Sequence, residues 1–366
     1  MIASNELKTS AGVLDGTEPA NHDLSVHAGN SVIHIGLHKV ASTTLQHSLH
    51  ALRPDLAAQG FFYPGDDLPH PKQHSDLALF LHEAGEEKYR TAMDAILRDF
   101  RNLEGANLLL SGEEFSSLLP AQIEALHRDL AETGRQFRVV LYVRNLYRIA
   151  ISAIAEHSKT GKFVAYPSRV IDRRRVNPSS ILSHWEDVFG KENVIAACLE
   201  ALPAETNIVS HFADLAGIKL PAEFRMIERN RSADPIASAL LSHLAYEFQV
   251  SHHFFYRSYF ENVRGRLALP RMEDHLLGTA DKWVADVDLS HPKLVPFRDL
   301  LRSRPTASPP ADASAESAVG YLRLLGKTLL RTAERIEQRD EQPKRSRRRK
   351  PPIEIGGPHR QRSTRR

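Results

Sequence analysis

The chain has 366 residues, 42% of them hydrophobic, which is enough for one large domain or two ordinary ones with an apolar core. No window approaches the roughly 18 uninterrupted apolar residues of a membrane helix, and the N-terminus lacks the basic start and apolar stretch of a secretory signal. The single cysteine, Cys198, excludes an internal disulfide and a cysteine metal cluster. We therefore expect a reducing, cytoplasmic compartment, with Cys198 buried at the end of a strand.

The net charge of +3 is unevenly distributed. Residues 343–366 contain ten Lys or Arg and one Glu, so this tail carries about +9 and the rest of the chain about −6. The tail has no apolar periodicity, which predicts a disordered segment. Such a segment can contact an anionic surface (lipid, nucleic acid or polysaccharide), or it can stay solvated without a dedicated partner.

In chain order, residues 1–30 are expected to form a flexible leader, and an alternation of apolar strands and amphipathic helices begins at Ser31. This alternation predicts an α/β fold in which crossover helices cover a central parallel sheet as three α/β/α layers. Strands are expected at 31–36, 107–111, 138–144 and 193–199, and helices at 42–52, 120–133 and 205–217.

After about residue 232 the pattern becomes mainly helical. We interpret residues 31–302 as one α/β domain, with this helical C-terminal portion either belonging to the domain or capping it. Residues 303–316 have the composition of a linker, a C-terminal amphipathic helix is expected over 317–340, and the basic tail occupies 341–366.

The stretch IHIGLHKVASTTLQ, residues 33–46, predicts a strand that ends in a tight loop and opens a helix. Backbone N–H groups and the helix dipole favour an anion at such a point. Lys39 adds an ammonium group, and Ser42, Thr43 and Thr44 add hydroxyl donors, so this loop can hold a phosphate or a sulfate. It contains no GxxxxGK[ST] pattern, which disfavours a nucleoside triphosphatase.

Within this stretch, GLHKVASTTLQ resembles the 5′-phosphosulfate loop of sulfotransferases, and LRPDLAAQGFFYPG (52–65) is similar to the segment that follows the loop in bacterial members. The resemblance implies a fold related to P-loop NTPases and 3′-phosphoadenosine 5′-phosphosulfate (PAPS) as sulfuryl donor. It places the lysine and the three hydroxyl residues against the 5′ side of the donor. Ala41, also in the loop, stands where the family usually has glycine, at a position suited to close backbone approach or positive φ.

A second motif follows the third predicted strand. RVVLYVRNLYRIAIS (138–152) gives a strand, then Arg144, and Ser152 eight residues later inside the next helix. A guanidinium group can bind a phosphate through two N–H donors, and Ser152, about two helical turns along, can reach the same group. Alone, an arginine at a strand end is usually an ordinary surface charge. The order and spacing resemble the family's 3′-phosphate motif, which implies that Arg144 and Ser152 hold that phosphate.

Transfer of a sulfuryl group to a hydroxyl requires a base near the acceptor. Glu113 lies at the carboxyl end of the second predicted strand, where open α/β sheets bind ligands, in a segment that resembles a family segment with Gly112 in place of a serine. His74 resembles the histidine of a His-x-x-Leu-Ala element in similar bacterial proteins, and histidine ordinarily titrates near neutral pH. Both remain candidates for the base, with Glu114 as a substitute. His38 is interpreted as a loop-packing residue, with contact to the phosphosulfate as the alternative.

Two further segments have open interpretations. RNRSADP (229–235) resembles an Asn-x-Ser stretch near the nucleotide, or it forms a helix N-cap at Ser232. The basic residues 169–176 could hold the donor or an acidic acceptor, or form a solvated loop.

The resemblance implies an acceptor with a hydroxyl or amine group, in particular a carbohydrate or glycolipid, and no metal. A P-loop kinase-like enzyme is an alternative. It would need a magnesium-binding acid after a strand, and Glu113 is the one residue that could take that role. A non-catalytic nucleotide-binding relative that anchors partners through its basic tail is another.

Overall fold

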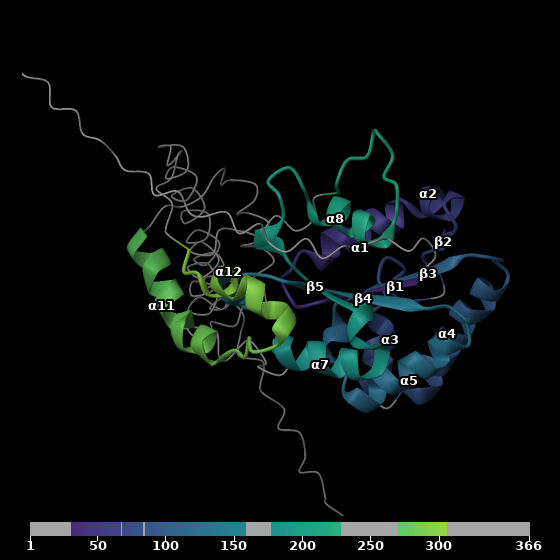
Figure 1. Ribbon diagram of the computed structural model, residues 1–366, viewed down its shortest axis with the longest axis horizontal. Helices are drawn as coiled ribbons and strands as arrows, with labels where there is room; N and C mark the ends of the chain where they lie inside the picture. The colour runs from purple at the N-terminus through teal and green to yellow at the C-terminus, as the bar shows by residue number, and fades with distance from the viewer. Residues whose placement is uncertain (1–30, 67, 83–84, 159–176, 228–269, 306–366) are drawn as a thin grey trace, which may run out of the picture.

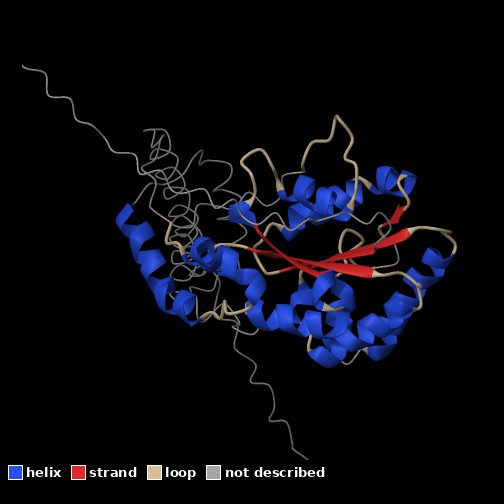
Figure 2. Ribbon diagram, viewed as in Figure 1, coloured by secondary structure: helices blue, strands red, loops and turns tan. Residues whose placement is uncertain are grey.

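The computed structural model describes residues 31–66, 68–82, 85–158, 177–227 and 270–305. Its centre is a five-stranded sheet in which every pair of neighbouring strands is parallel (Figure 2). In spatial order the strands are β2 (Phe61–Phe62), β3 (Asn107–Gly112), β1 (Ser31–Gly36), β4 (Phe137–Val143) and β5 (Val194–Cys198). The first strand is therefore central, with β3 on one side and β4 on the other.

Helices cover both faces of this sheet (Figure 1). One face carries α1 (Ser42–Ala51), α2 (Arg53–Ala58) and α8 (Ile208–Ala216). The opposite face carries α3 (Ser75–His82), α4 (Glu86–Arg101), α5 (Pro120–Ala131) and α7 (Pro178–Phe189). These three layers confirm the predicted α/β class with a central parallel sheet.

The central strands are buried and mostly apolar because helices cover both of their faces. All six residues of β1 are buried, and so are six of the seven residues of β4. The four predicted strands are confirmed to within one residue at each end. The fifth strand, β2, was not predicted, because two residues cannot show a periodic pattern.

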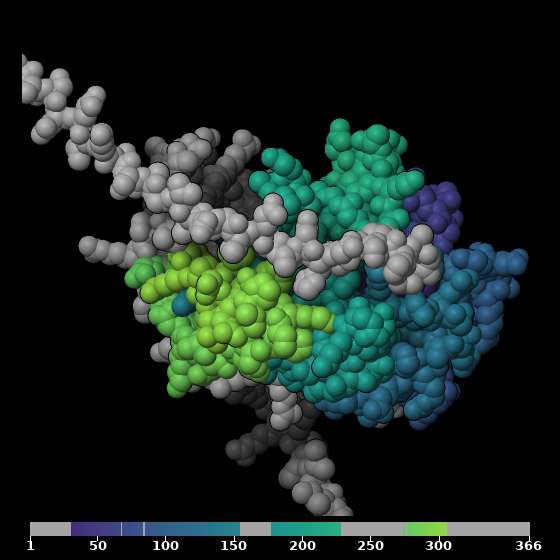
Figure 3. Space-filling model, viewed as in Figure 1, coloured from purple at the N-terminus to yellow at the C-terminus, as the bar shows by residue number. Residues whose placement is uncertain are grey.

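The C-terminal helices lie at one end of the sheet. The sixth helix, α6 (Leu146–Ser158), starts after β4 and packs against α11 (Pro270–Asp286) and α12 (Arg298–Arg302). Figure 3 shows residues 270–305, in green and yellow, packed directly against the teal part of the chain. Because α6 follows the end of β4, this segment lies at the carboxyl edge of the sheet.

The first two residues of the predicted linker, Ser303 and Arg304, contact the rest of the described chain. The Asn145 side-chain nitrogen donates to the Ser303 carbonyl at 2.7 Å, and Arg304 pairs with Asp274 at 2.7 Å. The leader 1–30, the remainder of the linker, the helix expected at 317–340 and the basic tail lie outside the described residues. Among the described helices, none is long and apolar enough to cross a membrane.

Candidate functional site

The loop between β1 and α1 has a strained backbone. Lys39 has φ of 70° and Ala41 has φ of 63°, so both L-residues are in the left-handed region. Ala41 is the N-cap of α1, and its carbonyl accepts the N–H of Thr44 at 3.0 Å. The left-handed conformation costs an alanine roughly 1–2 kcal/mol, which explains why a glycine suits this position. The loop adopts the turn nonetheless, and the first N–H groups of α1 have no acceptor within the helix.

We predict that Ala41→Gly raises the free energy of unfolding by about 1 kcal/mol, because glycine relieves the left-handed strain. Ala57, an exposed residue of α2 with ordinary helical geometry, provides the matched control. There the same change should lower stability by about 1 kcal/mol. Urea denaturation measures both variants, and destabilisation by Ala41→Gly would contradict the positive φ.

The three hydroxyl residues that open α1 are not equivalent. Ser42 is buried, whereas Thr43 and Thr44 are half-buried. A Cβ atom at Gly36 would lie 2.1 Å from Ser42 Oγ, so the glycine that ends β1 leaves the space that this hydroxyl occupies. Among the described residues Ser42 Oγ has no hydrogen-bond partner.

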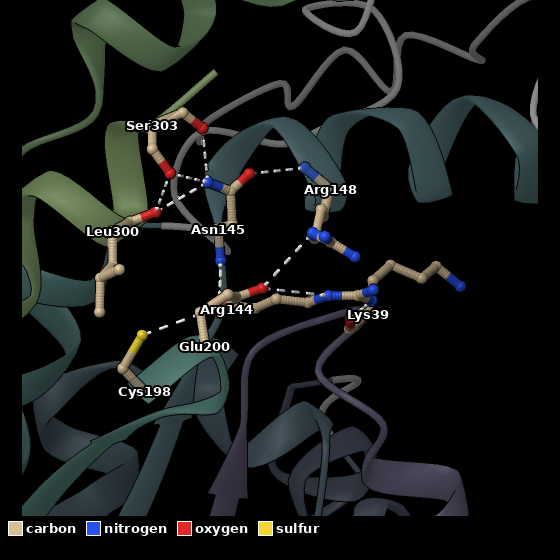
Figure 4. Close-up of polar contacts among 8 residues, drawn as sticks. All are labelled: Lys39, Arg144, Asn145, Arg148, Cys198, Glu200, Leu300 and Ser303. Atoms are coloured by element: carbon tan, nitrogen blue, oxygen red, sulfur yellow. Dashed lines mark hydrogen bonds and ion pairs between the residues drawn. The ribbon is translucent and has the colours of Figure 1, made fainter. Parts of the chain in front are cut away.

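Arg144 joins the two predicted anion-binding elements. It follows the last residue of β4, and its Nη1 donates to the Lys39 carbonyl at 2.7 Å. Burial lowers the pKa of the Arg144 guanidinium, while the Glu200 carboxylate acts in the opposite direction; an arginine keeps its charge under such a change. Figure 4 shows the guanidinium between the Lys39 loop and Glu200, with the Lys39 side chain extending away from Glu200. The structure thus brings Lys39 and Arg144 together.

Asn145 fixes the start of α6. Its Oδ1 accepts the Arg148 N–H at 3.2 Å, which satisfies one of the N–H groups that a helix start leaves without a partner. Its Nδ2 donates to the carbonyls of Leu300 and Ser303, each at 2.7 Å (Figure 4). Ser152 is half-buried and lies four residues after Arg148, so both residues share one face of α6. Arg148 was not predicted, although its spacing from Ser152 could have indicated it.

Glu200 supplies a carboxylate to this region. Its Oε2 accepts the Asn145 N–H at 2.8 Å, and Cys198 Sγ lies 3.7 Å from the same oxygen. Its Oε1 lies 3.9 Å from Nε of Arg144 and 3.9 Å from Nε of Arg148. Cys198 is buried at the end of β5, as predicted, and burial raises the pKa of its thiol to about 11. Glu200 was not predicted, although an acid directly after a strand at the carboxyl edge was a usable signal.

Glu113 and His38 form a close pair. Glu113 follows β3, and its Oε1 lies 2.5 Å from His38 Nδ1, while His38 Nε2 lies 3.9 Å from Glu114 Oε1. Since His38 directly precedes Lys39, the pair brings the end of β3 to the anion loop. His38 was expected to pack the loop or to touch the phosphosulfate, and its pairing with Glu113 was not predicted. A Cβ atom at Gly112 would lie 2.9 Å from the Phe115 ring, which explains the glycine where related segments have serine.

His74 is placed differently from the expectation. It is fully buried, its Nδ1 accepts the Ser111 N–H at 2.8 Å, and its Nε2 donates to the Pro64 carbonyl at 3.0 Å. Burial lowers its pKa to about 4. Both ring nitrogens are occupied by backbone partners, which argues against a role as base. Together with Ser75, whose Oγ accepts the Glu113 N–H at 3.0 Å, His74 holds the end of β3 in place.

We predict a loss of stability in mild acid from buried histidines. Burial lowers the pKa of His74 to about 4 and that of His34 to about 3, so between pH 6.5 and these values the unfolded chain binds more protons than the folded one. Stability is therefore fully present above pH 6.5 and falls with pH by about 1.4 kcal/mol per unit for each histidine. Urea denaturation at pH 6.5 and pH 5 should differ by about 3 kcal/mol, because the unfolded histidines are already half-protonated at pH 6.5, and by about half that in His74→Gln. Equal stability of the parent protein at both pH values would contradict this prediction.

Other expected site residues are outside the described part of the chain: residues 229–235 and the basic residues 169–176. Within the described ranges, no group of three His, Cys, Asp or Glu side chains is arranged to hold a metal ion.

No family model and no curated protein matches the chain. Among solved structures, the chain is similar to a sulfotransferase from Alicyclobacillus acidocaldarius, at 15% sequence identity and a TM-score of 0.35. The match covers 62% of this chain and 95% of that protein. A similarity this low carries no argument about activity.

Proposed function

We propose that this protein transfers a sulfuryl group from PAPS to a hydroxyl or amine of an acceptor. The observation that carries the proposal is the hydrogen bond from Arg144 Nη1 to the Lys39 carbonyl, at 2.7 Å. It joins the two motifs that resemble the donor-binding motifs of sulfotransferases, at the carboxyl edge of a parallel sheet, where such sheets bind ligands.

Each element has a role in holding the donor. The N-terminus of α1, which follows Ala41, would bind the 5′-phosphosulfate. The Lys39 ammonium and the hydroxyls of Ser42, Thr43 and Thr44 would contact the same group. Arg144 and Ser152 would bind the 3′-phosphate, with Arg148 on the same face of α6 as additional positive charge.

The His38–Glu113 pair is the proposed proton acceptor. As the acceptor oxygen or nitrogen attacks sulfur, Glu113 takes its proton and the bond from sulfur to the bridging phosphate oxygen breaks. Lys39 would neutralise the charge that develops on the leaving phosphate. The 2.5 Å contact occupies Glu113 Oε1, and no hydrogen bond from the described residues reaches Oε2, which is therefore the oxygen proposed to take the proton. His38 would hold the carboxylate in position.

The resemblance at the phosphosulfate loop supports a carbohydrate or glycolipid as acceptor. The basic tail, with ten Lys or Arg over 343–366, supports an electrostatic contact with an anionic surface. We therefore propose both the carbohydrate or glycolipid acceptor and the contact of the tail with an anionic surface.

Calorimetric titration tests the nucleotide assignment. Adenosine 3′,5′-bisphosphate, the product left by the donor, should bind without a metal ion and more tightly than ATP with magnesium. A preference for ATP–magnesium would instead support a kinase-like enzyme. Incubation with radiolabelled PAPS and a panel of saccharides, glycolipids and amines then tests transfer. Nucleotide binding without transfer to any acceptor would support a non-catalytic relative.

A further inference from the structure

The cationic cluster formed by Arg144 and Arg148 contains its own anion. The Glu200 carboxylate lies 3.9 Å from the Nε atoms of both arginines. At that distance neither contact is a hydrogen bond, so the guanidinium N–H donors are not consumed by Glu200. The carboxylate nevertheless reduces the charge of the cluster from two positive charges to one.

Glu200 is held in this position by the backbone. Its Oε2 accepts the Asn145 N–H at 2.8 Å, at the start of α6. Asn145 is itself fixed, because its Nδ2 donates to the carbonyls of Leu300 and Ser303 (Figure 4). Moving the carboxylate away would leave the Asn145 N–H without this acceptor. The negative charge is therefore a fixed part of the cluster.

We propose that Glu200 determines how tightly the protein holds the 3′-phosphate, by opposing the attraction of Arg144 and Arg148. This inference rests on the proposed function, in which Arg144 and Ser152 bind that phosphate. A phosphate placed against Arg144 comes close to a carboxylate that cannot withdraw, and like charges in partly buried surroundings repel. Glu200 thereby weakens binding of the bisphosphate product and favours its release. Its effect on the 5′-phosphate should be much smaller, because the loop after β1 is proposed to bind that group through Lys39 and the start of α1.

The test uses Glu200→Gln, since glutamine keeps a side-chain oxygen that can accept the Asn145 N–H and loses only the charge. Affinities for adenosine 3′,5′-bisphosphate and for AMP, which lacks the 3′-phosphate, are measured by calorimetry. We expect about tenfold tighter binding of the bisphosphate, with AMP affinity unchanged. The gain should shrink at high salt, because screening reduces charge repulsion and leaves a structural effect intact.

Glu132→Gln is the matched control. Glu132 pairs with Arg101 at 2.7 Å, is exposed, and follows α5 just before β4 begins, so it lies at the amino edge of the sheet. This substitution makes the same chemical change far from the arginine cluster and should leave both affinities unchanged.

Each outcome decides the proposal. Selective, salt-dependent tightening for the bisphosphate supports it. Unchanged or weaker bisphosphate binding in Glu200→Gln overturns it, and weaker binding would show that Glu200 holds the arginines in place instead. Equal tightening for AMP also overturns it. If the parent protein binds no bisphosphate, the proposed function itself fails, which is a separate result.

Discussion

Replacement of Lys39 by methionine should lower kcat/KM for sulfuryl transfer by about 10²- to 10³-fold, because the ammonium is the proposed stabiliser of charge on the leaving phosphate. Methionine keeps an unbranched side chain of similar length. It also leaves the backbone carbonyl that accepts the Arg144 hydrogen bond. The left-handed φ of 70° disfavours lysine and methionine alike, so the loop conformation should persist. Kinetics with labelled PAPS measure the effect.

Lys88, an exposed residue of α4, is the matched control for Lys39. Lys88→Met removes one positive charge without touching the loop after β1 and should leave kcat/KM unchanged. Parental activity in Lys39→Met would contradict the assigned role.

The second large effect is expected at the proposed base. Glu113→Gln should lower kcat by about 10²- to 10⁴-fold and leave affinity for adenosine 3′,5′-bisphosphate unchanged, since glutamine cannot take the proton of the acceptor. Glu114→Gln should have a much smaller effect, because Glu114 lies farther from His38, at 3.9 Å against 2.5 Å for Glu113. Steady-state kinetics and calorimetry separate the two quantities.

His38 provides a companion test of the same pair. His38→Asn retains an N–H donor near the position of Nδ1 and should keep more activity than His38→Ala, because the proposed role of His38 is to hold Glu113. If Glu113→Gln transfers sulfate at the parental rate, the assignment of the base is wrong.

The fold was predictable where the sequence has a strong local pattern. The segments NLLLS (107–111) and RVVLYVR (138–144) contain uninterrupted apolar runs, which are typical of strands buried on both faces. They therefore indicated parallel strands covered by helices. The two residues of β2 have no such pattern, and their pairing with β3 depends on tertiary packing. The individual contacts that the helical C-terminal segment makes near the candidate site also could not be predicted, since Asn145 meets Leu300 across 155 positions of the chain.

In the candidate site, the sequence indicated the two cations more clearly than the acids around them. Lys39 and Arg144 each belong to a motif with defined spacing, and the structure brings them into contact. His74 and His38 show what sequence cannot decide. Both are histidines near apolar segments, but His74 is enclosed by backbone partners, whereas His38 faces Glu113. Only the relative positions of separate strand ends distinguish a structural histidine from one at the site.

The claim that one nucleotide spans both cationic anchors is tested most directly by calorimetry on Arg144→Ala. We expect this variant to lose most of the parent protein's preference for adenosine 3′,5′-bisphosphate over AMP, because only Ser152 and Arg148 would then contact the 3′-phosphate. Its affinity for AMP should fall much less, since the loss there is limited to the hydrogen bond with the Lys39 carbonyl. Arg144, which is hydrogen-bonded to the loop that carries Lys39, would then supply most of the discrimination between the two nucleotides. Undiminished preference for the bisphosphate in Arg144→Ala would contradict the account.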